Sequence, residues 1–70
     1  MLAWEIELTY NIEMFTSEKK NWTPEELQMA YRIWNGALGA KHGYKHDTGC
    51  GSCRRDVVTG VRKFALQYVK

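Results

Sequence analysis

The chain has 70 residues, of which 44% are hydrophobic and 26% charged, with 10 basic against 8 acidic side chains. This size and balance are typical of one small soluble domain spanning residues 1–70, and they exclude a multidomain enzyme. Because a chain of this length buries only about 60% of the surface that its unfolded form exposes, we expect a metal ion or a partner chain to add stability.

The apolar stretches are too short to cross a membrane. Glu or Arg interrupts them every few residues, whereas a membrane span needs roughly 18 uncharged positions. The first residues, 1–5, also lack the basic region with which a secretory signal peptide begins. We therefore expect no membrane partner and a location inside the cell.

Residues 2–14 alternate between apolar and polar side chains. The apolar side chains occupy every even position, namely Leu2, Trp4, Ile6, Leu8, Tyr10, Ile12 and Met14. A period of two is typical of a strand with one buried face. With the two helices predicted below, it indicates an α+β fold in which residues 1–20 form a long N-terminal strand or hairpin, packed beside a two-helix hairpin. An all-α three-helix bundle is the alternative.

A lone N-terminal strand would leave its backbone N–H and C=O groups unpaired. It would need a second strand from a hairpin within the arm, from another copy, or from a different protein. We therefore predict that other protein chains bind to its apolar face, through Trp4, Ile6, Leu8 and Tyr10.

A helix is predicted over residues 23–39. Thr23 and Glu26 have the spacing of a capping box, and Pro24 occupies the first helical position. Apolar residues then recur at helical spacing, at Leu27, Ala30, Tyr31, Trp34, Ala37 and Leu38. Gly39 supplies the expected stop.

A glycine-rich loop over residues 40–51 leads to a second, basic helix over residues 52–69. Apolar side chains at Val57, Val61, Phe64 and Tyr68 predict that helix. Gly60 inside it is costly for a helix, and we expect it to let the two helices approach closely.

The loop and the start of the second helix together present four side chains that can bind a metal ion: His42, His46, Cys50 and Cys53. Two imidazoles and two thiolates can complete a tetrahedral zinc site, and zinc would stabilise so small a domain. Two alternatives remain open: the cysteines are buried small side chains with the histidines exposed, or the Cys-Gly-Ser-Cys turn at a helix start is a redox pair.

Charge is unevenly distributed along the chain. Residues 1–40 contain three basic and six acidic side chains, and residues 41–70 contain seven basic and two acidic ones. Such asymmetry favours head-to-tail association or contact with nucleic acid. The candidate anion or nucleic-acid ligands on the second helix are Arg54, Arg55, Arg62 and Lys63.

Two sequence segments resemble small accessory and virion proteins of tailed bacteriophages, including the crAss-like group. They are Thr23-Pro-Glu-Glu-Leu27 with Tyr31–Asn35, and Thr48-Gly-Cys-Gly-Ser-Cys-Arg-Arg-Asp56 before a basic helix, together covering about residues 23–68. The resemblance implies a phage protein located in the virion or the host cytoplasm, and it carries over no catalytic residue.

The sequence thus favours a non-enzymatic assembly module that docks to protein through its N-terminal strand and basic C-terminal helix. A zinc-stabilised nucleic-acid-binding module is the alternative. Salt dependence distinguishes them, because nucleic-acid binding weakens steeply as salt rises.

Overall fold

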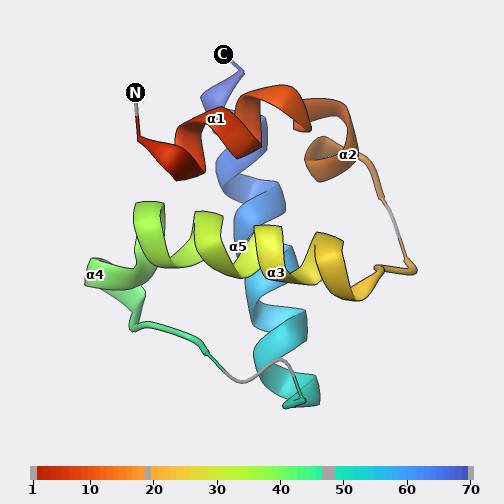
Figure 1. Ribbon diagram of the computed structural model, residues 1–70, viewed down its shortest axis with the longest axis vertical. Helices are drawn as coiled ribbons and strands as arrows, with labels where there is room; N and C mark the ends of the chain where they lie inside the picture. Colours follow the sequence, from red (N-terminus) through yellow and green to blue (C-terminus); the bar gives the residue numbers. More distant parts are fainter. Residues whose placement is uncertain (1, 19, 47–48, 70) are drawn as a thin grey trace.

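The computed structural model describes residues 2–18, 20–46 and 49–69, and most of these residues are helical (Figure 1). The elements are α1 (Ala3–Tyr10), α2 (Ile12–Thr16), α3 (Pro24–Ile33), the π-helical turn η1 (Trp34–Leu38), α4 (Gly39–His42) and α5 (Gly51–Tyr68). These described ranges contain no strand. The predicted α+β class, with an N-terminal strand or hairpin, is therefore wrong.

The segment predicted as a strand forms α1 and α2 instead. An alternating sequence contains apolar residues four apart as well as two apart, and residues four apart share one face of a helix. Leu8 and the half-buried Trp4 lie on the inner face of α1, while Ile6 and Tyr10 are exposed. A helix pairs most of its own backbone groups. The segment therefore needs no partner strand, and the prediction that it must pair with a second strand is wrong. Binding of other protein chains to this segment stays a prediction.

A corner at Asn11 separates α1 from α2. The Asn11 side-chain amide donates a hydrogen bond of 2.9 Å to the carbonyl oxygen of Glu7. The Glu7 carboxylate accepts two hydrogen bonds of 2.7 Å from Arg32 in α3. These bonds raise the pKa of Arg32 above its ordinary value, against an opposing effect of burial. The polar contacts thereby tie α1 to α3.

The predicted capping box at the start of α3 is confirmed. Thr23 Oγ1 accepts a hydrogen bond of 3.2 Å from the Glu26 backbone N–H, and Glu26 Oε1 accepts one of 2.8 Å from the Thr23 N–H. The helical path continues through η1 and α4, past Gly39, where we expected it to end. It stops at Gly43, whose φ of 92° suits glycine best.

The second predicted helix is α5, which begins at Gly51, one residue before the predicted start. Its inner face consists of Val57, Val61 and Ala65, all fully buried. A Cβ atom on Gly60 would collide with the indole ring of Trp34. The prediction that Gly60 permits a close approach of the two helices is therefore confirmed.

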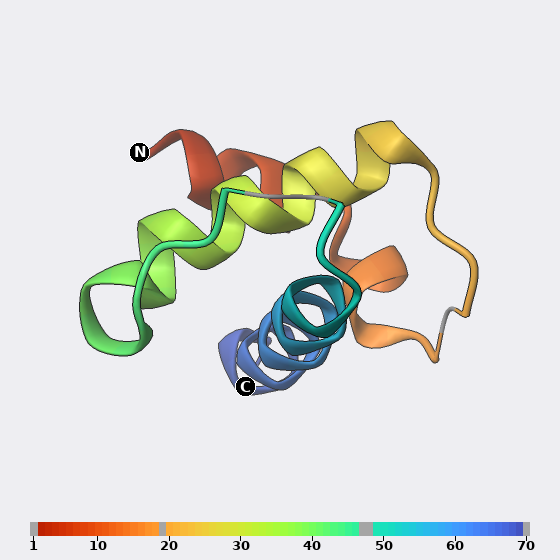
Figure 2. The ribbon, with the colours of Figure 1, turned by 90° about the horizontal axis from the view of Figure 1, so that it is seen from below.

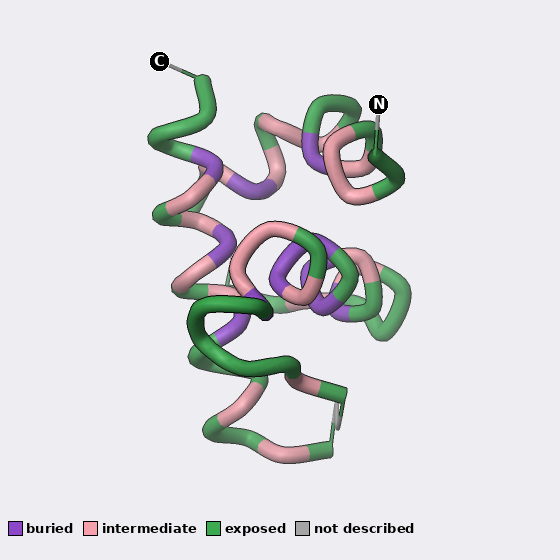
Figure 3. The backbone as a smooth tube through the Cα atoms, turned by 90° about the vertical axis from the view of Figure 1, so that its left-hand side faces the viewer, coloured by how far each residue is buried: buried purple, intermediate pink, exposed green. Residues whose placement is uncertain are grey.

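The core lies where α5 crosses beneath α3, with α2 on one side and η1 and α4 on the other (Figure 2). Buried stretches of the chain face this crossing and exposed stretches face outward (Figure 3). The buried cluster consists of Leu8, Phe15, Ala30, Tyr31, Ile33, Trp34, Val57, Val61 and Ala65. None of the helices in the described ranges has the length and apolar character needed to span a bilayer.

Candidate functional site

The loop that follows α4 is fixed to the helix that the chain has just left. Trp34 Nε1 donates a hydrogen bond of 2.8 Å to the carbonyl oxygen of Gly43. Asn35 Nδ2 donates one of 2.9 Å to the Lys45 carbonyl, and Asn35 Oδ1 accepts one of 2.9 Å from the Lys45 N–H. All three bonds are partly buried, so water competes weakly for them. The Trp34 bond fixes the backbone at Gly43, and the two Asn35 bonds fix the backbone of Lys45.

Tyr44 is an exposed residue of this loop that packs back against α4. Its ring packs on Gly39, where a Cβ atom would lie 2.6 Å from the ring. His46 stacks on the same ring, with the two ring centroids 6.3 Å apart. Gly39 therefore provides room for Tyr44, whereas we had predicted that it ends the helix.

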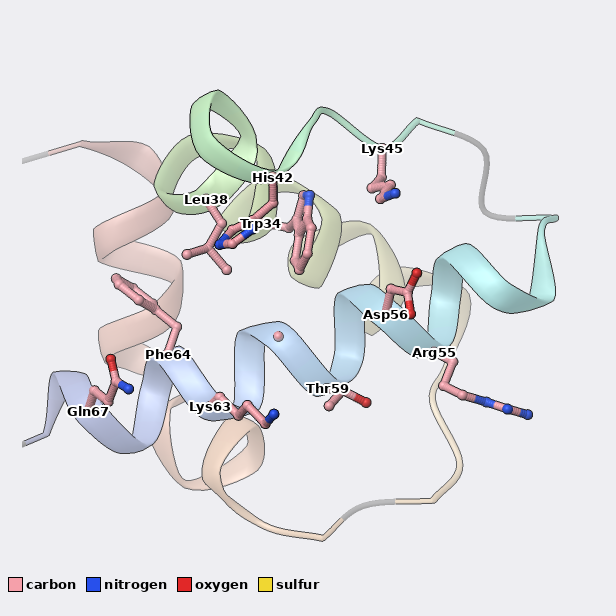
Figure 4. Close-up of a pocket in the computed structure, with 11 residues that line it drawn as sticks. Trp34, Leu38, His42, Lys45, Arg55, Asp56, Thr59, Lys63, Phe64 and Gln67 are labelled. Atoms are coloured by element: carbon pink, nitrogen blue, oxygen red, sulfur yellow. The ribbon is translucent and has the colours of Figure 1, made fainter.

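A groove with a volume of about 630 Å³ runs between α5 and the segment that comprises η1, α4 and the loop as far as Lys45 (Figure 4). Its floor is apolar and is made by Trp34, Leu38, Gly60 and Phe64. Its rim is polar and consists of His42, Lys45, Arg55, Asp56, Thr59, Lys63 and Gln67.

The rim residues on α5 are aligned because they recur at helical spacing. Arg55, Thr59, Lys63 and Gln67 are four residues apart, so they lie along one line of the helix. At 1.5 Å per residue this line is about 18 Å long. Lys45 approaches from the opposite side, on the loop held by Asn35 (Figure 4). The groove thus combines residues that are distant in the sequence.

The groove carries an excess of positive charge. The residues that line it include three cations, Lys45, Arg55 and Lys63, and one carboxylate, that of Asp56. Within the part of the chain that the structure describes, none of these three cations has an ion-pair partner. Arg55 points away from the floor at one end, toward a second cleft (Figure 4). An apolar floor with unpaired cations on its rim suits a ligand that is apolar on one side and acidic along its edges.

The second cleft lies at the N-terminal end of α5 and has a volume of about 450 Å³. Its lining consists of Lys20, Asn21, Trp22, Leu27, Gly51, Arg54, Arg55 and Val58. The four predicted anion ligands are consequently divided among different surfaces. Lys63 lines the groove, Arg54 the second cleft and Arg55 both, whereas Arg62 lines neither and lies 3.6 Å from the Glu18 carboxylate.

The four predicted metal ligands are not brought together as a set. Cys50 precedes α5 as its N-cap, and its Sγ accepts a hydrogen bond of 3.3 Å from the Cys53 N–H. His42 packs against Trp34, with ring centroids 5.8 Å apart, and His46 lies on Tyr44. No group of three or more His, Cys, Asp or Glu side chains that could hold a metal ion occurs among the described residues. The zinc site stays a prediction.

The four predicted partner-binding residues of α1 fall on opposite faces. Leu8 is buried in the core, and Trp4 packs edge-on against Phe64 with ring centroids 5.6 Å apart. Ile6 and Tyr10, by contrast, are 39% and 85% exposed. Ile6 and Tyr10 are therefore the most exposed of the four, Trp4 is half-buried and Leu8 is inaccessible while the fold is intact.

Sequence reasoning missed most of the groove. It assigned Trp34 and Leu38 only to a helical stripe and gave no role to Asn35, Lys45 or Thr59. The four-residue spacing from Arg55 to Gln67 was a signal that could have located one side of the groove. No family model, curated protein or solved structure matches the chain.

Proposed function

We propose that the chain is a non-enzymatic assembly module that binds an acidic amphipathic helix of a partner protein in the groove between α5 and the Trp34–His42 segment. The observation that carries this proposal is the combination of an apolar floor with the cations Lys45 and Lys63, which have no acidic partner among the residues that the structure describes. The basic C-terminal helix predicted as a docking element thus contributes one wall of the groove.

The dimensions of the groove support a helical ligand. An amphipathic helix binds a groove through apolar side chains three or four residues apart. Three such anchors, at positions i, i+4 and i+8, cover about 12 Å, which fits within the roughly 18 Å wall of α5. Acidic residues beside the anchors would then face Lys45 and Lys63. Burial of the anchors supplies affinity, and the charges select the partner and its orientation.

The alternative, a zinc-stabilised nucleic-acid-binding module, has weaker support. Its proposed ligands Arg54, Arg62 and Lys63 lie on different surfaces, and Arg62 already lies near Glu18. Nucleic-acid binding favours cations that follow one continuous line of phosphates. If the resemblance to phage proteins holds, the partner would be another protein of the virion.

A binding experiment tests this proposal. A designed helical peptide with leucine at every fourth position and glutamate between is titrated into the protein, and Trp fluorescence is followed. We expect Lys63→Glu to weaken peptide binding at least tenfold and Lys20→Glu, which lies outside the groove, to change it little.

Single-stranded and duplex DNA are titrated in parallel at several salt concentrations. DNA binding that exceeds peptide binding and falls steeply with salt would overturn the proposal in favour of the nucleic-acid alternative. Equal effects of Lys63→Glu and Lys20→Glu on peptide binding would also overturn it, because the peptide would then be responding to overall charge.

A further inference from the structure

The chain itself carries a helix of the kind that the groove suits. Leu2 precedes α1, and Ile6 and Tyr10 follow at four-residue intervals on its outer face. Their exposed fractions are 60%, 39% and 85%. These three residues, which we call the α1 stripe, point away from the side of α1 that buries Leu8. The stripe is therefore available without any unfolding.

The surroundings of the α1 stripe are acidic. Residues 2–18 contain four acidic and no basic side chains. Glu7 is engaged by Arg32, and Glu18 lies near Arg62. Glu13 is exposed, and within the described part of the chain it has no ion-pair partner. Glu5 caps the start of α1 by accepting a hydrogen bond from the Leu2 N–H. Glu5 thus lies on α1 between Leu2 and Ile6 in the sequence, and Glu13 follows Tyr10 by three residues in the first turn of α2.

We infer that the occupant of the groove is the α1 stripe of a second copy of this chain, an inference that rests on the proposed function. The charges are complementary, because Glu5 and Glu13 would meet a rim that carries Lys45 and Lys63. The spacing is complementary too, since the stripe spans about 12 Å against a wall of about 18 Å. None of the three stripe residues lines the groove, so one copy presents both surfaces.

The contact joins two different surfaces. Such heterologous contacts produce rings where the rotation closes and open chains where it does not. This geometry agrees with the opposite charges of the two halves of the sequence. It would allow successive copies of the chain to join in the same way.

Complementation between two defective variants tests the inference. Ile6→Asp places a charge in the middle of the α1 stripe, and Lys63→Glu reverses a charge on the rim of the groove. Both residues lie on helix surfaces. Sedimentation velocity is recorded over a wide concentration range for wild type, for each variant and for their equimolar mixture. We expect wild type to associate, each variant alone to be at least tenfold weaker in self-association, and the mixture to recover association through one intact contact per pair.

Matched controls make the result specific. Leu66→Asp changes a side chain of the same exposure as Ile6, 38% against 39%, but outside both surfaces. It should associate as wild type does. Tyr10→Lys provides a second stripe variant at a highly exposed position, and circular dichroism verifies that each variant is folded.

A monomeric wild type at every concentration, or a mixture that stays monomeric, would overturn the inference. Other outcomes test the proposed function independently of this inference. If wild type is monomeric and still binds the designed peptide in a manner that depends on Lys63, only the identity of the occupant is wrong. If Lys63→Glu alters neither self-association nor peptide binding, both proposals fall.

Discussion

The side chain of Asn35 holds the backbone of Lys45 through two hydrogen bonds of 2.9 Å, one donated by Asn35 and one accepted. The two residues are ten positions apart, and the chain between them passes through α4 and the turn at Gly43. One side-chain amide therefore fixes the loop that carries a cation to the edge of the groove.

Replacing Asn35 should loosen the loop. We expect Asn35→Ala to lower the free energy of unfolding by about 1–2 kcal/mol, because two hydrogen bonds are lost while alanine regains part of the cost through its helix propensity. Urea denaturation measures the change. Asn21→Ala is the control, because Asn21 is exposed and makes no such bonds to the residues that the structure describes. It should change stability by under about 0.5 kcal/mol. A similar effect of both substitutions would contradict the role assigned to Asn35.

Gly60 should not tolerate a side chain. Alanine usually stabilises a helix by about 1 kcal/mol relative to glycine, but a Cβ atom on Gly60 would collide with the buried ring of Trp34. We therefore expect Gly60→Ala to destabilise the protein by about 1–3 kcal/mol. Gly51→Ala in the first turn of the same helix meets no atom within 4 Å and should be neutral or stabilising. Thermal unfolding of the two variants provides the comparison, and a stable Gly60→Ala variant would contradict this packing.

Leu8 and Ile6 distinguish a helix from a strand at the N-terminus. On a strand both side chains would share one face, whereas on α1 Leu8 is fully buried and Ile6 is 39% exposed. We expect Leu8→Ala to cost about 2–5 kcal/mol in unfolding free energy, and Ile6→Ala under about 1 kcal/mol. Equal losses at the two positions would contradict the helical assignment.

Cys50 distinguishes a helix cap from a zinc ligand. As the N-cap of α5 it accepts a hydrogen bond through Sγ, a task that serine performs well. If capping is its main role, Cys50→Ser should keep or raise the unfolding midpoint, and Cys50→Ala should cost about 0.5–2 kcal/mol. If the predicted zinc is bound, both variants should lose far more, because binding of a structural zinc ion contributes on the order of 10 kcal/mol. Denaturation with and without a chelator separates the two outcomes.

The sequence predicted those parts of the fold that depend on neighbouring residues. The capping box at Thr23 and Glu26 is such a local signal, as are the apolar spacing of α5 and the unusual Gly60. The N-terminal segment was mispredicted because its alternation satisfies both a period of two and a spacing of four. Only packing of Leu8 against the rest of the chain decides between them.

The groove could not be predicted from local patterns. It requires Lys45, on a loop, to line the same groove as Lys63, on α5. That placement depends on the bonds made by Trp34 and Asn35. The prediction that Gly39 ends the helix was wrong because it, too, depends on a contact distant in the sequence. Glycine often ends a helix, yet here its missing side chain makes room for the ring of Tyr44.

The most direct test of the groove as a binding site is to map N–H resonances by nuclear magnetic resonance while the designed acidic peptide is added. The account predicts that the largest shifts occur at the indole N–H of Trp34 and at the amides of Thr59 and Lys63. Shifts concentrated instead around Lys20 and Arg54, or none at a saturating peptide concentration, would contradict it.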